Sequence, residues 1–414
     1  MSDSVVIVAA KRTPIGSMNG QLLPLSSPQL ASVAIKAAVE QSGLKVEDIT
    51  EALIGCVLPA ALGQAPARQA VLGAGLLQST ATSTVNKVCG SGMKTVMLAY
   101  DSILAGSANV MVAGGMESMS NAPYLLPKAR QGFRYGHVKA LDHMAFDGLE
   151  NAYDGKSMGI FADATAAKYG FTRADQDAFA AESVKRAQAA VASGAFKAEI
   201  AAVTVKGKAG DVLLDTDEPP GQCKPEKIPS LKPAFSKDGT VTAASSSSIS
   251  DGAAALILMK ESDAKARGLK PIARIVGHAS NAHEPEWFTT APVGAIDKLH
   301  KKLGWGPENV DLYEINEAFA VVTMAAMKDL NLPHAKVNVN GGACAMGHPI
   351  GASGARLIVT LLHALAGKVE ATLVTVGGQE LVWNGMVVLP DETLPLRVSA
   401  WRDRLQQWRR ASTP

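Results

Sequence analysis

Cysteine is scarce in this sequence, which has four cysteines in 414 residues. They are too few and too widely spaced for a disulfide scaffold, and neither a CxxC pair nor a cluster of cysteine and histidine suggests zinc. We therefore predict no metal site and a reducing compartment. The four thiols are Cys56, Cys89, Cys223 and Cys344.

An excess of charge of one sign is also lacking, since 40 Lys and Arg residues oppose 38 Asp and Glu residues, for a formal net charge of +2. Such a chain has no strong overall field to attract nucleic acid or a membrane surface. No apolar run approaches the roughly 18 residues of a membrane span, and the strand-like residues 5–10 are not preceded by a signal segment. We expect a cytoplasmic protein that binds neither nucleic acid nor membrane.

Strand and helix signals alternate over most of the chain, which is long enough for two or three domains. The first part contains predicted strands and helices at residues 5–10, 28–41, 51–58, 65–77 and 109–113. From residue 118 to about 248 the pattern changes to loops around one long helix, near 172–193. The α/β pattern then returns, so the sequence predicts an α/β fold with an inserted region.

The chain is organised around residues 85–94, VNKVCGSGMK, where a β-rich run breaks at Cys89 and resumes with helical periodicity. This pattern predicts a thiol at the N-terminus of a helix, where free N–H groups and the helix dipole favour the thiolate. Gly90 and Gly92 permit a tight turn and the close approach of a substrate. The alternative for Cys89 is a packed core thiol, because cysteine is among the most buried residue types. For Cys56 we predict such a place in the core.

An internal repeat links this elbow to a second one near the C-terminus. Residues 89–98 align with residues 350–359 after one small gap, which pairs Ser91-Gly92 with Ser353-Gly354. Farther on, GGME at 114–117 matches GGQE at 377–380. Two related halves are therefore expected to face each other, with an active site between them. The second elbow carries His348 between glycine turns, where a catalytic role competes with a purely structural one.

Four motifs in this sequence resemble those of the thiolases, the coenzyme-A-dependent members of the β-ketoacyl condensing superfamily. The resemblance covers about residues 4–380, and its motifs are VNKVCGSG at 85–92, VAGGMESMSNAPY at 112–124, NEAFA at 316–320 and NVNGGACAMGHPIGASGAR at 338–356. It implies an α/β fold, a thiolase-like duplicated five-layer αβαβα sandwich with an inserted loop domain. The implied divisions are 1–118 plus 249–270, 119–248, 271–390 and an atypical basic tail at 391–414.

The resemblance also implies roles for particular residues. Cys89 is the expected nucleophile, His348 the base that activates it, and Asn316 the residue that fixes a water at the oxyanion. A pantetheine tunnel is expected to be lined by Ser247, Phe235, Met158 and Phe319, with ordinary core packing as the alternative for the last three. Acetyl-CoA, acetoacetyl-CoA and CoA are then substrates, with no cofactor, and the chain is expected to form a homodimer or homotetramer.

The chain departs from the family pattern near its end. Where thiolases carry a second, proton-shuttling cysteine, alignment of the last strands places Val374, which has no proton to transfer. Cys344 is a substitute to consider, although ACA at 343–345 is typical of a packed turn. From residue 382 the likeness ends, and the spacing of Trp401, Leu405 and Trp408 predicts a basic amphipathic helix.

These observations predict an acetyl-CoA C-acetyltransferase that forms acetyl-Cys89 and condenses it with a second acetyl-CoA, or runs the reverse reaction. One alternative is a 3-ketoacyl-CoA thiolase of broader chain length. The other is a thiolase-like protein that binds CoA thioesters but condenses them poorly, because of Val374.

Overall fold

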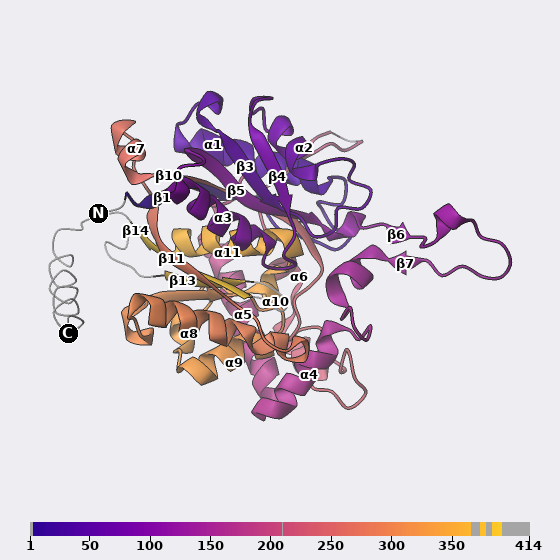
Figure 1. The fold of residues 1–414 in the computed structure, drawn as a ribbon. Helices are drawn as coiled ribbons and strands as arrows, with labels where there is room; N and C mark the ends of the chain where they lie inside the picture. The colour runs from indigo at the N-terminus through magenta and orange to yellow at the C-terminus, as the bar shows by residue number, and fades with distance from the viewer. Residues whose placement is uncertain (1–2, 209, 366–372, 378–382, 391–414) are drawn as a thin grey trace, which may run out of the picture.

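The computed structural model describes residues 3–208, 210–365, 373–377 and 383–390 (Figure 1). For residues 373–377 and 383–390 only the strands are described, and their side chains are not. The predicted tail at 391–414, including the helix expected around Trp401 and Trp408, lies outside the described residues.

Ten strands form one curled sheet, with the hydrogen-bonded order β12-β13-β14-β11-β1-β10-β5-β3-β4 and with β2 paired to β10. Strand β1 pairs antiparallel with β10 on one side and with β11 on the other, so it joins the two halves of the chain. The ten strands are β1 (Val5–Arg12), β2 (Gly16–Ser17), β3 (Glu51–Gly55), β4 (Ala81–Val85), β5 (Val110–Ser118), β10 (Ser250–Lys260), β11 (Ala273–Asn281), β12 (Leu312–Ile315), β13 (Leu373–Gly377) and β14 (Trp383–Pro390).

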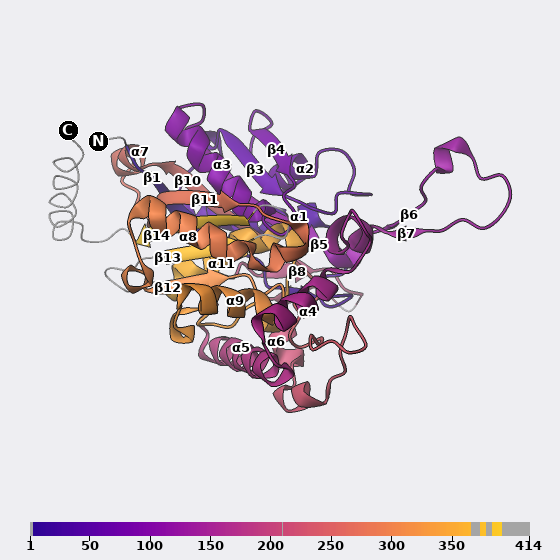
Figure 2. The same ribbon diagram turned by 60° about the horizontal axis from the view of Figure 1, so that its bottom comes forward.

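Helices form three layers around the two parts of this sheet (Figures 1 and 2). On the outside lie α1 (Ser27–Ser42) and α2 (Pro66–Gly73) at one face, and α8 (Ala291–Leu303) and α9 (Ala320–Leu330) at the other. Between the two parts of the sheet lie α3 (Ser91–Ala105) and α11 (Ile350–Ala364). Successive side chains of β1 point to opposite faces of the sheet, so this strand packs against two helix layers. Val5 and Ile7 pack with the central helices, and Val6 and Val8 pack with α1. The predicted five-layer αβαβα fold is confirmed.

Local signals explain several helix ends. Gly43 closes α1 with a φ of +71°, as predicted. The predicted helix at 65–77 is shorter in the structure, because α2 ends at Gly73 and Gly75, with a φ of +87°, turns the chain. Leu76 N then donates to Val71 O, which completes a Schellman-type cap.

The segment between β5 and β10 contributes no strand to the central sheet within the described residues. Its helices are α4 (Met158–Tyr169), α5 (Arg173–Ser193) and α6 (Glu218–Gln222), and its two small sheets pair β6 (Tyr124–Leu125) with β7 (Leu141–Asp142) and β8 (Val203–Val205) with β9 (Val212–Leu214). The predicted long helix is α5, which begins after a capping box between Thr172 and Asp175. The exact domain boundaries stay predictions.

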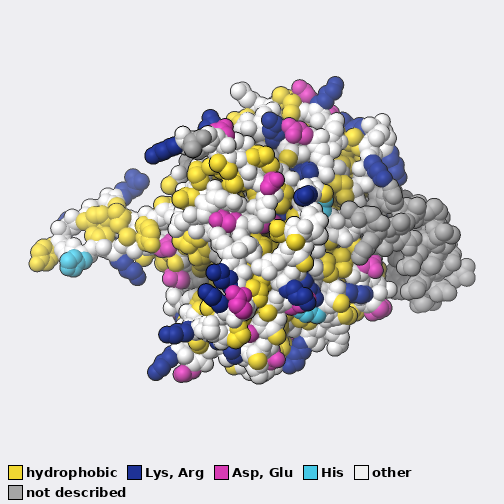
Figure 3. All heavy atoms as spheres, turned by 180° about the vertical axis from the view of Figure 1, so that it is seen from behind, with side chains coloured by type: hydrophobic (Ala, Val, Ile, Leu, Met, Phe, Trp, Pro, Cys, Tyr) yellow, Lys and Arg dark blue, Asp and Glu magenta, His cyan; other side chains and the backbone are white. Residues whose placement is uncertain are grey.

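Strands β6 and β7 form the base of a long arm, residues 124–142, that projects from the body (Figures 1 and 3). Its exposed side chains are both apolar and basic, and include Leu126, Phe133, Tyr135, Lys128 and Arg134. Elsewhere α7 (Glu261–Ala266) follows β10, and the short α10 (Ala343–Met346) precedes α11. Among the described residues, no helix combines the length and the apolar character needed to cross a bilayer.

The two central helices meet at the glycines that the repeat pairs. A Cβ on Gly92 would lie 2.8 Å from the backbone nitrogen of Ala355, and a Cβ on Gly354 would overlap the backbone nitrogen of Met93. Each glycine therefore contacts the residue that follows its counterpart. This reciprocity is expected from a local twofold relation between the halves, and it brings the N-termini of α3 and α11 together.

This contact predicts that Gly354→Ala separates the central helices, since a backbone atom cannot rotate out of the way. We expect a loss of about 1–3 kcal/mol in the free energy of unfolding, as for other overpacked cores. Gly221→Ala in α6 is the matched control, because its added methyl group meets open space. Urea unfolding of both variants is the measurement, and equal stability of the two would contradict the close approach.

Candidate active site

Cys89 is fully buried and lies at a strained elbow between β4 and α3. The residue before it, Val88, has a φ of +44°, a conformation that a β-branched residue rarely adopts. Two side chains hold this turn. The Asn86 Oδ1 atom accepts from Val88 N at 2.9 Å, and the Ser91 hydroxyl donates to Val88 O at 2.6 Å. The elbow is thus fixed just before the first turn of α3.

The surroundings of Cys89 are mostly apolar and come from both halves. Its cluster contains Val57 and Leu58 from the first half, Met119 from the segment that follows β5, and Ile350 from the start of α11. Apolar burial disfavours a thiolate, whereas the N-terminus of α3 favours it. Because Ile350 is two residues from His348, this packing brings the thiol to the loop that carries the predicted base.

His348 lies in the turn between α10 and α11, where Gly347 has a φ of +90°. Its backbone N–H donates to Ser248 O at 3.0 Å, and its Nδ1 atom lies 2.6 Å from the Ser353 hydroxyl. Burial lowers the pKa of His348 to about 3, and the positive charge of Arg356 acts in the same direction. The imidazole is therefore neutral at pH 7, the state in which it can accept a proton from a thiol.

Asn316 follows β12 and is fully buried. Its Nδ2 atom lies 3.3 Å from His348 Nε2, so the structure brings these two predicted residues into contact. Among the described residues, its Oδ1 atom is buried without a hydrogen-bond partner. Such an atom is uncommon inside a protein and indicates a place where a water or a ligand atom binds.

A buried carboxylate fastens the loop after β3 to the second elbow. Glu117, at the end of β5, accepts backbone N–H bonds from Val57 at 2.9 Å, Leu58 at 3.2 Å and Gly351 at 3.0 Å. Burial raises the pKa of Glu117 to about 7, although the three N–H donors oppose that shift. These bonds also explain why the strand predicted to reach residue 58 ends early: Cys56 N still donates to Val85 O of β4, but the N–H groups of Val57 and Leu58 turn to Glu117.

The predicted tunnel residues gather in one place. Met158 and Phe235 pack against the buried cluster that contains Phe319, and the two phenylalanine rings meet edge to face with centroids 5.8 Å apart. Ser247 lies beside them, because its N–H donates to Ala318 O at 3.0 Å. The inserted segment and the second half therefore share this wall.

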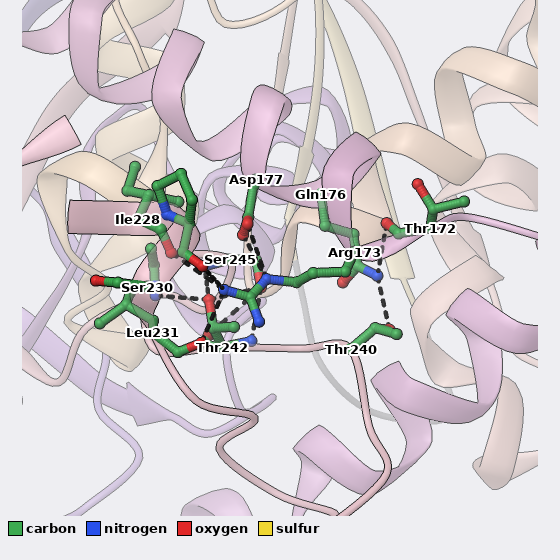
Figure 4. Close-up of polar contacts among 12 residues, drawn as sticks. Thr172, Arg173, Gln176, Asp177, Ile228, Ser230, Leu231, Thr240, Thr242 and Ser245 are labelled. Carbon is green, nitrogen blue, oxygen red and sulfur yellow. Dashed lines mark hydrogen bonds and ion pairs between the residues drawn. The ribbon is translucent and has the colours of Figure 1, made fainter. Parts of the chain in front are cut away.

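Polar contacts to α5 hold the inserted loop in place (Figure 4). The Arg173 Nη2 atom donates to Ile228 O at 3.1 Å and to Leu231 O at 2.8 Å. One turn later, Gln176 Nε2 donates to Thr240 Oγ1 at 2.8 Å. These bonds anchor both ends of the stretch that carries Phe235, so the position of its ring does not depend on apolar packing alone.

Comparisons with known proteins identify the family of this chain. Models of the thiolase N-terminal domain and the thiolase C-terminal domain match residues 5–262 and 269–380. The chain belongs to the thiolase family. A probable acetyl-CoA acetyltransferase of Dictyostelium discoideum is 51% identical to this thiolase over 88% of this chain and 89% of its own. An acetyl-CoA acetyltransferase of Chromobacterium violaceum is 49% identical over 90% of this chain and 97% of its own.

A solved structure shows the same fold. The crystal structure of Acat5 thiolase from Ascaris suum in complex with coenzyme A superposes with a TM-score of 0.89 at 40% sequence identity. The match covers 94% of this thiolase and all of the Ascaris chain.

The other cysteines of this thiolase are packed thiols, and none of the four cysteines forms a disulfide. Cys56 belongs to the core, as predicted, and burial together with Glu117 raises the pKa of its thiol. The Cys344 thiol donates to Glu317 O at 3.7 Å, and burial raises its pKa well above the usual range. This environment favours a packed, protonated Cys344 over a substitute acid/base.

Position 374 lies in β13, opposite Tyr313 of the parallel strand β12. Ile315 is paired with Val376, so Asn316 stands one residue beyond the described pairing and three residues beyond the level of Val374. The side chain of Val374 lies outside the described part of the chain. Sequence reasoning assigned no role to Glu117 or Ser353, although the repeat already paired Ser353 with a serine of the first elbow.

The lowered pKa of His348 predicts how stability changes with pH. The unfolded chain takes up a proton at His348 near the ordinary value of 6.5, whereas the folded protein resists it until about pH 3. Folding stability from this residue is therefore present above pH 6.5 and is lost as the pH falls below that value.

His348→Gln removes this contribution. Between pH 7 and pH 5 we expect the variant to lose roughly 2 kcal/mol less stability than the unmodified protein, at about 1.4 kcal/mol per pH unit below 6.5. Urea unfolding at both pH values measures the difference, with His137→Gln in the exposed arm as the control. Identical slopes for all three proteins would show that His348 is not held neutral by burial.

Proposed function

We propose that this thiolase is an acetyl-CoA C-acetyltransferase that interconverts two acetyl-CoA with acetoacetyl-CoA and CoA. The observation that carries the proposal is the packing of Cys89, at the start of α3, against the start of α11, whose preceding turn holds a neutral His348. The names of the Dictyostelium and Chromobacterium relatives support the same activity.

The first half-reaction transfers the acetyl group to the enzyme. His348 takes the thiol proton of Cys89, and the thiolate attacks the thioester carbonyl carbon of acetyl-CoA. The developing oxyanion is stabilised near Asn316 and His348, where donors are typically worth 10²–10³-fold in rate. Collapse of the intermediate breaks the bond to the CoA sulfur, which leaves with the proton held by His348. Acetyl-Cys89 and CoA result.

The second half-reaction forms the carbon–carbon bond. A base removes an α-proton from a second acetyl-CoA, and the resulting enolate attacks the carbonyl carbon of acetyl-Cys89. The bond to the sulfur breaks, Cys89 regains a proton, and acetoacetyl-CoA leaves. In this scheme Met158, Phe235, Phe319 and Ser247 line the pantetheine tunnel, and CoA thioesters are substrates, so no cofactor is needed.

Oligomeric state and compartment are part of the proposal. A homodimer or homotetramer is supported by the arm at 124–142, because exposed aromatic and apolar groups such as Tyr135 and Phe133 favour association with another surface. We place the protein in the cytoplasm on the grounds of its cysteine usage and its near-neutral charge.

Acetylation of Cys89 is the first test. Incubation with acetyl-CoA should add one acetyl group to the Cys89 peptide, detected by mass spectrometry, and Cys89→Ser should abolish both the adduct at this peptide and turnover. Cys56→Ser is the matched control and should leave acetylation intact. An unmodified Cys89 peptide in active protein would refute the nucleophile.

Chain-length preference separates the proposal from its nearest alternative. Thiolysis by CoA should be faster with acetoacetyl-CoA than with a 3-ketoacyl-CoA of eight carbons, compared as kcat/KM. A clear preference for the longer substrate would instead identify a broader 3-ketoacyl-CoA thiolase.

A condensation-impaired thiolase is the second candidate, and the apolar residue at position 374 favours it. General acid/base catalysis is worth about 10²–10⁴-fold. If that group is missing, acetylation of Cys89 should be ordinary while condensation is slow. Val374→Cys should then raise the condensation rate by a large part of that factor, because valine and cysteine are close in volume.

The experiment times Cys89 acetylation and acetoacetyl-CoA thiolysis separately in each protein. Val376→Cys, two residues farther along β13, is the control for a cysteine in this strand. An ordinary thiolysis rate in the unmodified protein, unchanged by Val374→Cys, would reject the impaired thiolase.

A further inference from the structure

Ser353 lies in the first turn of α11, five residues after His348, and is fully buried. Its hydroxyl oxygen makes two contacts, one to His348 Nδ1 at 2.6 Å and one to the Pro349 carbonyl at 3.0 Å. A serine hydroxyl has one proton to donate and lone pairs with which to accept. The carbonyl of Pro349 can only accept, so it takes that proton. Toward His348 the hydroxyl therefore acts as an acceptor.

The other end of the imidazole leads to the same assignment. His348 Nε2 faces Asn316 Nδ2, an amide nitrogen that donates and cannot accept. A neutral ring has one protonated nitrogen and one with a free lone pair, so Nδ1 bears the proton and Nε2 is the acceptor. The opposite tautomer would require both a reversed Asn316 amide and a Ser353 hydroxyl turned away from Pro349.

We propose that Ser353 is a positioning residue, whose hydroxyl holds His348 as the Nδ1–H tautomer and so makes Nε2 the nitrogen that accepts the proton of Cys89. This inference rests on the proposed function for its catalytic consequence. Groups that orient a functional histidine through its other nitrogen typically affect activity by about 10–100-fold when they are removed.

The first elbow supports this role through the same device. Ser91, which the repeat pairs with Ser353, donates its hydroxyl proton to Val88 O and accepts from Lys87 N at 2.8 Å. In each half, a buried serine in the first helical turn donates to a carbonyl three or four residues back and accepts an N–H from the catalytic loop. One serine holds the turn of the nucleophile, and the other holds the ring of the base.

The tautomer can be measured directly in the unmodified protein. Histidine labelled with ¹⁵N gives two-bond ¹H–¹⁵N correlations that distinguish Nδ1–H from Nε2–H, and His348→Gln identifies the signal of His348. We expect a protonated Nδ1 and an unprotonated Nε2. A protonated Nε2 would overturn the proposal without any Ser353 variant.

Variants then test whether Ser353 maintains that state. In Ser353→Ala we expect the His348 signals to shift toward the Nε2–H form, with kcat reduced by about 10–100-fold and KM changed by less than about 3-fold. Ser353→Thr keeps the hydroxyl and should restore most of both properties. Thr360→Val is the matched control, because it removes another buried hydroxyl of α11, one that bonds Glu199 rather than His348.

The outcomes separate this inference from the proposed function. An unchanged Nδ1–H signal in Ser353→Ala would overturn the positioning role. So would a loss of kcat in Thr360→Val equal to that in Ser353→Ala. If Ser353→Ala changes the tautomer while the unmodified protein turns over neither acetyl-CoA nor acetoacetyl-CoA, then the positioning of His348 is supported and the acetyltransferase assignment fails.

Discussion

The close approach of α3 and α11 is the constraint on which the site depends. Two glycines without side chains let the helices come within backbone contact, at Gly92 and Gly354, and each glycine faces the residue after its counterpart. Both helices begin at this crossing, one after Cys89 and the other after His348. Two helix N-termini therefore face the same small volume, and both favour negative charge there. A thiolate and a thioester oxyanion are the charges that thiolase chemistry creates.

Burying two helix starts leaves backbone N–H groups that need acceptors. Glu117 supplies an oxygen atom to one such group, Gly351 N in the first turn of α11, and it also accepts from Val57 N and Leu58 N, which follow β3. Asn316, beside His348, differs from these groups, because its buried amide oxygen lacks a partner among the described residues. The Glu117 bonds thus satisfy the N–H groups that they join, whereas the Asn316 amide oxygen stays without a partner beside the neutral imidazole. That contrast separates the scaffold from the site.

Local chemistry made much of the fold predictable. Gly43 as a helix end, Thr172 before the long helix, and the Cys89 elbow all follow from signals within a few residues. The internal repeat predicted that the two elbows face each other, because two related halves that pack together can bring their corresponding segments into contact. The strained φ of Val88 could not be predicted in this way, since valine by itself disfavours that conformation.

Contacts between residues that are far apart along the chain could not be predicted from the sequence. Glu117 bonds residues 59 and 234 positions away, and no periodic pattern records such a pairing. Phe235 and Phe319 are a similar case. The resemblance to the thiolases predicts that both line a tunnel, but only the structure shows that their rings are in contact. Ser353 is an intermediate case. The repeat singled it out, but its role depends on the hydroxyl being aimed at His348 and at Pro349 together.

The inserted segment makes the site a product of three parts of the chain. Cys89 comes from the first half, His348 from the second, and Phe235 from the insertion. Arg12, fully buried at the end of β1, binds Asp217 through two hydrogen bonds and Glu199 through a third, which joins the insertion to the central sheet. Buried ion pairs give little net stability, yet loss of one partner is costly because a buried charge is left unpaired. Their contribution here is therefore to position the insertion. They restrict it to the placement in which these charges are paired, and in that placement Phe235 packs against Phe319 of the second half.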